Sequence, residues 1–142
     1  MVKSVLVTGE FTEVMAKAGA ALLRRLDTGR ADVRSAFWFY VADVKAWKLV
    51  IASKKVDSEG PREFYKRIVE ANKAAARNEY IVSLNDIGVT NMTNPVVVLI
   101  GIAVGTPLGE VGNIRFSRNT INGHFIEDAY IYRSSIREEN IN

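Results

Sequence analysis

The dipeptide Asn122-Gly123, set between two stretches of alternating apolar and polar residues, constrains the fold more than any other feature. Both residue types accept the positive φ that a two-residue type I′ turn demands, so the pattern predicts a β-hairpin. A two-residue loop also predicts the register, starting with Ile121 opposite His124. The further expected pairs are Thr120 with Phe125, Arg118 with Glu127, Phe116 with Ala129, Arg115 with Tyr130, and Ile114 with Ile131.

Strand alternation divides this hairpin into two faces. We expect the face with Ile114, Phe116, Ala129 and Ile131 to join the core. The opposite face is expected to be exposed, and the polar tail, residues 134–142, to fray. That outer face carries Asn113, Arg115, Ser117, Asn119, His124, Ile126, Asp128, Tyr130 and Tyr132.

Two segments have the periodicity of amphipathic helices. The first runs from about Phe11 to Leu26 and is followed by Gly29, a residue type that commonly ends helices. The second follows Gly60-Pro61 and is expected to end near Asn78. The predicted buried stripe is Phe11, Val14, Met15, Ala18, Leu22 and Leu26 in the first helix, and Phe64, Tyr65, Ile68, Val69, Asn72 and Ala76 in the second. On the outer face of the second helix we expect the pairs Glu63 with Arg67 and Lys66 with Glu70.

Residues 33–53 are rich in aromatic and β-branched side chains, with a short break at Asp43, Val44 and Lys45, and so predict a second hairpin. Its first strand is apolar on both faces: Phe37, Phe39 and Val41 point one way, and Trp38 and Tyr40 the other. Such a strand is either central in a covered sheet, which we favour, or exposed to a partner subunit.

The segments after the second helix are less regular. A short strand is expected within residues 80–89. Residues 95–104 are compatible with a strand, because valine and isoleucine are abundant, or with a short buried helix capped by Asn94, which we favour. A glycine-rich loop follows. Together these elements predict one α+β domain over residues 1–142: a mainly antiparallel sheet built from two hairpins, with two amphipathic helices packed on one face.

Composition excludes several classes of site. The 142 residues contain no cysteine, which excludes disulfides and thiolate chemistry and fits a reducing compartment, so we expect a cytoplasmic protein. The apolar stretch after Lys3 is only three residues long, and we expect no membrane association. The net charge is +3, with 19 basic and 16 acidic residues interleaved along the chain. That balance favours an ordinary charged surface over a nucleic-acid footprint.

Two catalytic patterns fail on inspection. Gly9 after an apolar stretch lacks the further glycines of a dinucleotide-binding turn, and Glu10 would repel phosphates. Asp43 with Lys54 or Lys55 suggests a metal-dependent nuclease or hydrolase. That chemistry needs an acidic residue two positions before the lysine to hold a divalent cation, and Ala52 and Ser53 stand there instead.

The outer face of the last hairpin is therefore the candidate binding surface. His124 is the single histidine, and Asp128 lies near it on the same predicted face, so the two could form an acid/base pair or be simply solvated. The full set is Arg115, Asn119, His124, Asp128, Tyr130 and Tyr132. Arginine and tyrosine are enriched where proteins contact each other and where single-stranded nucleic acid stacks. We expect a non-catalytic interaction module without cofactor or metal, bound to a protein partner or to a second copy as a homodimer. A single-stranded nucleic-acid-binding protein and a small nuclease or hydrolase are the alternatives.

Overall fold

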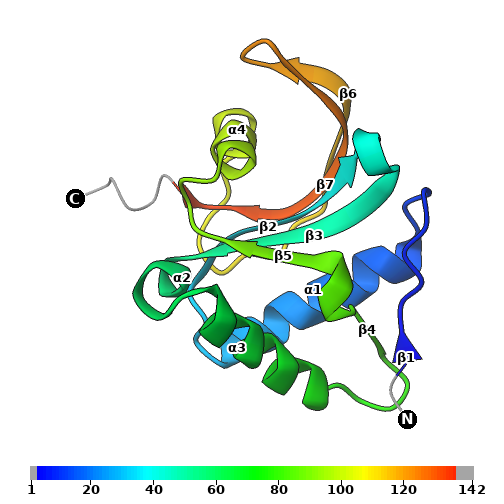
Figure 1. Cartoon of the computed structure of the whole chain (residues 1–142), viewed down its shortest axis with the longest axis vertical. Coiled ribbons are helices and arrows are strands. Elements are labelled where there is room, and N and C mark those ends of the chain that lie inside the picture. Colours follow the sequence, from blue (N-terminus) through cyan, green and yellow to red (C-terminus); the bar gives the residue numbers. More distant parts are fainter. Residues whose placement is uncertain (1–2, 137–142) are drawn as a thin grey trace.

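The computed structural model describes residues 3–136, in which a five-stranded sheet lies between helices on its two faces (Figure 1). The strand order is β5-β3-β2-β7-β6. A short parallel pair, β1 with β4, lies beside α1. The strands are β1 (Lys3–Ser4), β2 (Val33–Val41), β3 (Ala46–Ser53), β4 (Tyr80–Ile81), β5 (Ile87–Thr90), β6 (Ile114–Ile121) and β7 (His124–Ser134).

The closing hairpin, β6 with β7, confirms the predicted turn. Asn122 and Gly123 have φ values of 50° and 79°, as a type I′ turn requires. The pairs from Ile121 with His124 down to Ile114 with Ile131 occur in the predicted register. Arg118 and Glu127 are the exception, since they are not among the paired residues, and Arg118 has a left-handed φ of 45°.

The aromatic hairpin, β2 with β3, is also confirmed, and β2 lies centrally between β3 and β7. Phe37 and Trp38 are both fully buried, on opposite faces of the sheet. The loop is a 3₁₀ turn over Ala42–Val44, closed by Lys45 in the left-handed region. Phe37 and Trp38 therefore belong to the core, whereas Phe39 and Tyr40 nearer the loop are half-buried.

The helices are α1 (Glu13–Thr28), α2 (Lys54–Glu59), α3 (Pro61–Lys73) and α4 (Pro95–Ala103). Thr12 caps α1 and Gly29 ends it, while Asn94 caps α4 by accepting from Val96 and Val97. The preference for a helix over residues 95–104 is confirmed. The spacing of apolar residues did not predict α2, because six residues are too few to show the 3.6-residue period of a helix.

Several details of the amphipathic helices differ from expectation. Val14 and Val69 lie on exposed surface, and α3 ends at Lys73 rather than near Asn78. The expected pairs on α3 do not form: Glu63 binds Lys66, Glu70 binds Lys73, and Arg67 binds Glu59 of α2. The extra helix α2 brings Glu59 within reach of Arg67, which decides the pairing.

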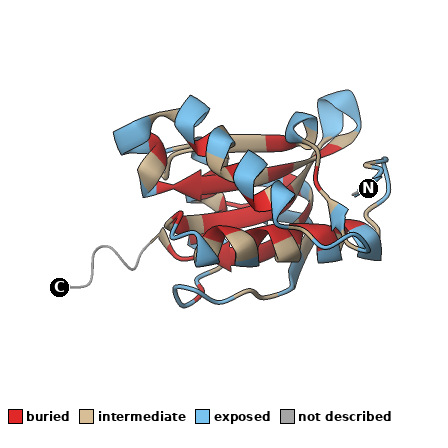
Figure 2. Ribbon diagram, turned by 90° about the horizontal axis from the view of Figure 1, so that it is seen from below, coloured by how far each residue is buried: buried red, intermediate tan, exposed pale blue. Residues whose placement is uncertain are grey.

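The sheet is mixed rather than mainly antiparallel, and helices cover both of its faces rather than one. After β3 the chain passes through α2 and α3 and returns as β5, which pairs with β3 in parallel. Helices α1 and α3 pack with Trp38, Leu49 and Phe64 in one apolar cluster. The smaller cluster on the other face joins α4 to Phe37 and Ile131. Figure 2, which views the molecule from the side of α1 and α3, shows buried strands and helices whose outer sides are exposed.

The end of β7 is buried and does not fray. Ser134 and Ser135 are 2% exposed and bond to Thr106, which holds the loop after α4 against the sheet. Residues 137–142, the rest of the expected frayed tail, lie outside the described residues. Within residues 3–136, no helix is long and apolar enough to cross a membrane.

Candidate functional site

The outer face of the closing hairpin brings Arg115 and Asp128 together. The Arg115 guanidinium donates two hydrogen bonds of 2.7 Å to the Asp128 carboxylate, and Ser117 donates a third of 2.6 Å. Burial alone would raise the pKa of Asp128, but these hydrogen bonds and the Arg115 charge outweigh it and hold that pKa below its usual value. The same guanidinium lies 5.3 Å from the ring centre of Phe11 and 5.8 Å from that of Trp47.

Tyr130 is half-buried and joins this aromatic cluster. Its ring stacks on Phe11 at 4.8 Å, and Trp47 donates a hydrogen bond of 3.2 Å to the carbonyl of Gly9. The segment before α1 therefore lies across this part of the sheet. Arg115, Asp128 and Tyr130 are brought together as predicted, but their contacts hold the N-terminal segment of the same chain.

Tyr132 is buried, so it is not part of an exposed binding surface. A register shift occurs between Ala36, opposite Arg133, and Phe37, opposite Ile131, so β7 has one extra residue there. The Tyr132 hydroxyl accepts a hydrogen bond of 3.0 Å from Trp38 and donates one of 2.6 Å to the carbonyl of Ala16. Burial raises the pKa of Tyr132.

Asn119 and His124 lie nearer the turn and are exposed. Asn119 accepts a hydrogen bond from the backbone of Thr120, and no described residue bonds to the His124 ring. Ile126, expected on this outer face, is buried with α4. The irregular conformation at Arg118 interrupts the alternation, so the two halves of the hairpin turn different faces to the core. His124 and Asp128 consequently do not pair.

The nuclease-like residues are also dispersed. Asp43 lies in the exposed loop between β2 and β3, whereas Lys54 and Lys55 begin α2 at the far end of β3. Across residues 3–136, no three histidine, aspartate or glutamate side chains converge in a way that could hold a metal ion. The described residues therefore contain no carboxylate cluster that could replace the acidic residue missing from the nuclease-like pattern.

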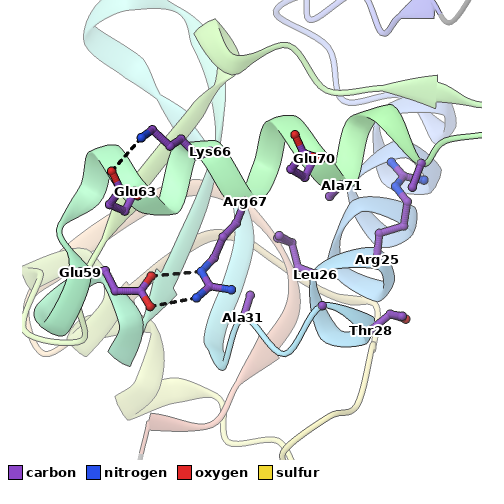
Figure 3. Close-up of a pocket in the computed structure, with 12 residues that line it drawn as sticks. Arg25, Leu26, Thr28, Ala31, Glu59, Glu63, Lys66, Arg67, Glu70 and Ala71 are labelled. Carbon is purple, nitrogen blue, oxygen red and sulfur yellow. Dashed lines mark hydrogen bonds and ion pairs between the residues drawn. The ribbon is translucent and has the colours of Figure 1, made fainter.

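A groove of about 680 Å³ lies between the C-terminal half of α1, α2 and α3 (Figure 3). Its apolar floor consists of Leu26, Ala31 and Ala71, all of which are nearly inaccessible to solvent. Charged side chains form its rim, and Arg67 holds Glu59 through two hydrogen bonds of 3.2 and 2.9 Å. The Arg67 hydrogen bond lowers the pKa of Glu59. The volume lies in the range of small-molecule sites.

Helix α4 presents a different kind of surface. None of its nine residues has a polar side chain. Val97 and Ile100 are buried against the sheet, whereas Val98 and Ile102 on the outer side are 41% and 43% exposed. A helix that is apolar on all sides is normally covered on all sides. The sequence predicts this helix as a buried one, whereas in the structure only its inner side is buried and its outer side is exposed.

No protein-family model, no curated protein and no solved structure matches this chain.

Proposed function

We propose that this protein is a non-catalytic interaction module that self-associates through the outer face of α4. The observation that supports this proposal is the apolar stripe formed by Pro95, Val98 and Ile102, which are exposed although the helix has no polar side chain. Exposed apolar surface of this kind is typical of protein contact sites. The outer sides of α1 and α3, by comparison, carry charged residues such as Lys17 and Glu70.

A second copy of the chain suits this surface. In a two-fold symmetric dimer the same patch lies on both sides, so it must be complementary to itself. An uncharged stripe meets this condition, because no like charges face each other when two α4 helices pack antiparallel. Interfaces of homodimers are also more apolar than those of transient complexes. The outer face of the closing hairpin is a weaker alternative, because Arg115 and Tyr130 already bind within the chain.

The test is to place charge on the stripe and measure the molar mass in solution by sedimentation and light scattering. We expect the wild type to be a dimer and Val98→Glu/Ile102→Glu to dissociate at least about tenfold more readily, because each interface would bury unpaired carboxylates. Thermal unfolding of the dissociated variant should show that the domain itself is intact, since both positions are exposed.

Val69→Glu on α3 is the matched control. Val69 is 36% exposed and lies on the outer side of a helix, but away from α4. It should leave the dimer unchanged. A wild type that is monomeric at the highest attainable concentration, or a dimer that both variants weaken equally, would exclude self-association through α4.

A further inference from the structure

The groove between α1 and α3 contains an arginine that uses only part of its hydrogen-bonding capacity. Arg25 lines the groove from α1, and its side chain is 14% exposed. Its Nη1 lies 3.4 Å from Oε1 of Glu79, a long contact. Its Nε and Nη2 are buried, and neither has a hydrogen-bond partner among residues 3–136. Buried donors without partners are costly, so a group that accepts from them would be bound favourably.

The other charged groups on the rim are already paired. Arg67 binds Glu59, Lys66 lies 3.0 Å from Glu63, and Lys73 lies 3.2 Å from Glu70. Each glutamate of the rim therefore has its own basic partner, and Figure 3 shows the first two pairs on one side of the groove with Arg25 at its other end. Arg25 also has an acidic partner, Glu79, so the rim carries no surplus charge, and Arg25 differs from the other basic residues in having two donors without hydrogen bonds.

The unused atoms indicate which anion fits. Nε and Nη2 form one edge of the guanidinium, with two parallel N–H groups that match the two oxygens of a carboxylate. Two other arginines of this chain use the same edge in this way: Arg67 holds Glu59, and Arg115 holds Asp128. In Arg25 the edge faces protein atoms, so a ligand requires the guanidinium to turn toward the groove. The long contact to Glu79 is a weak restraint on that rotation.

We propose that this groove binds a small carboxylate with an apolar tail. The carboxylate pairs with Nε and Nη2 of Arg25, and the tail lies on the floor formed by Leu26, Ala31 and Ala71. This site is separate from α4, so it does not depend on self-association.

Octanoate is the probe, with octanol as the analogue that has the tail but no charge. Binding is followed by titration of backbone amide NMR signals of the full chain, which also show where the probe lies. We expect octanoate to shift signals of α1 and α3 saturably, and to bind at least tenfold more tightly than octanol. Arg25→Gln should weaken octanoate binding at least tenfold and leave the weak binding of octanol unchanged.

Arg24→Gln is the matched control, because Arg24 is the neighbouring, exposed arginine of the same helix, and it should bind octanoate as the wild type does. Ala74→Leu adds volume to the groove wall at an exposed position and should weaken both probes, which provides a second test if Arg25→Gln does not fold. Equal affinity for octanoate and octanol, equal octanoate affinity of wild type and Arg25→Gln, or signal shifts confined to elements other than α1, α2 and α3 would overturn the proposal.

Discussion

The two faces of the sheet are covered in different ways. On one face, α1 and α3 bury apolar stripes and expose charged residues, and buried polar contacts join them to the sheet. On the other, the single helix α4 contributes apolar side chains only and leaves part of them exposed. The outer side of the first face is rich in charged side chains, whereas the outer side of the second is apolar at Val98 and Ile102. The difference shows that a helix can bury its inner side against the sheet whether its outer side is charged or apolar.

Arg133 joins α1 to the sheet through several hydrogen bonds, and we expect its replacement to cause the largest loss of stability. It is 1% exposed, and it binds Asp27 of α1 through hydrogen bonds of 2.9 and 2.7 Å and the carbonyls of Val33 and Glu110. Arg133→Met should lower the free energy of unfolding by about 3 kcal/mol, because the partners of a buried guanidinium are left unpaired. Urea denaturation measures the loss.

Arg24→Met on the exposed side of α1 is the control and should change stability by less than about 0.5 kcal/mol. If the two arginine variants unfold at the same urea concentration, the polar contacts at Asp27 do not hold α1 to the sheet.

A glycine in each covering helix allows the same substitution to be compared on both faces. A Cβ on Gly19 of α1 would overlap the Tyr132 hydroxyl and lie 2.8 Å from Nε1 of Trp38, both fixed in the core. A Cβ on Gly101 of α4 would meet the end of the Ile136 side chain, at 2.5 Å from Cδ1, which can rotate away. Gly19→Ala should therefore destabilise by about 2 kcal/mol. Gly101→Ala should be near neutral, because alanine favours a helix over glycine by about 1 kcal/mol, and this gain offsets the cost of moving the Ile136 side chain.

Thermal unfolding of the two alanine variants measures this difference. Tyr132→Phe provides a further check, because removing the hydroxyl should relieve part of the overlap in Gly19→Ala while costing the hydrogen bonds to Trp38 and Ala16. Equal melting temperatures for Gly19→Ala and Gly101→Ala would contradict the view that the first face is packed more rigidly.

The smallest expected effect concerns pH and the N-terminal segment. The pKa of Asp128 is lower in the folded protein than its ordinary value. Its contribution to stability is therefore fully present above the unfolded value, about 3.9, and is lost as the pH falls through the lower folded value. Because Arg115 and Asp128 are partly exposed, the loss should be under about 1 kcal/mol.

Trp47 fluorescence reports this change, since Trp47 contacts both Phe11 and the carbonyl of Gly9. Asp128→Asn should remove most of the pH dependence in this acidic range, with Asp43→Asn in the exposed loop as control. An unchanged acid transition in Asp128→Asn would assign the transition to other carboxylates.

How much could be predicted from sequence differs between local and distant contacts. The turn at Asn122-Gly123, the register of β6 with β7, the caps of α1 and α4 and the aromatic hairpin all follow from residues close together in the chain. The candidate site was predicted in part: Arg115, Asp128 and Tyr130 do meet, because cross-strand register brings them together. That they bind the segment at Phe11 could not be predicted, since Phe11 is more than 100 residues away in sequence.

By itself, the sequence determined where most helices, strands and turns lie, because backbone propensity, capping and alternation act over a few residues. Only the tertiary structure decided that β5 pairs with β3 in parallel, that α4 covers the second face, and that β7 has an extra residue that buries Tyr132 and Arg133. Each of these outcomes depends on which distant segments can fill one shared core. Packing of that kind sums many weak contacts over the whole chain, and no short stretch of sequence specifies it.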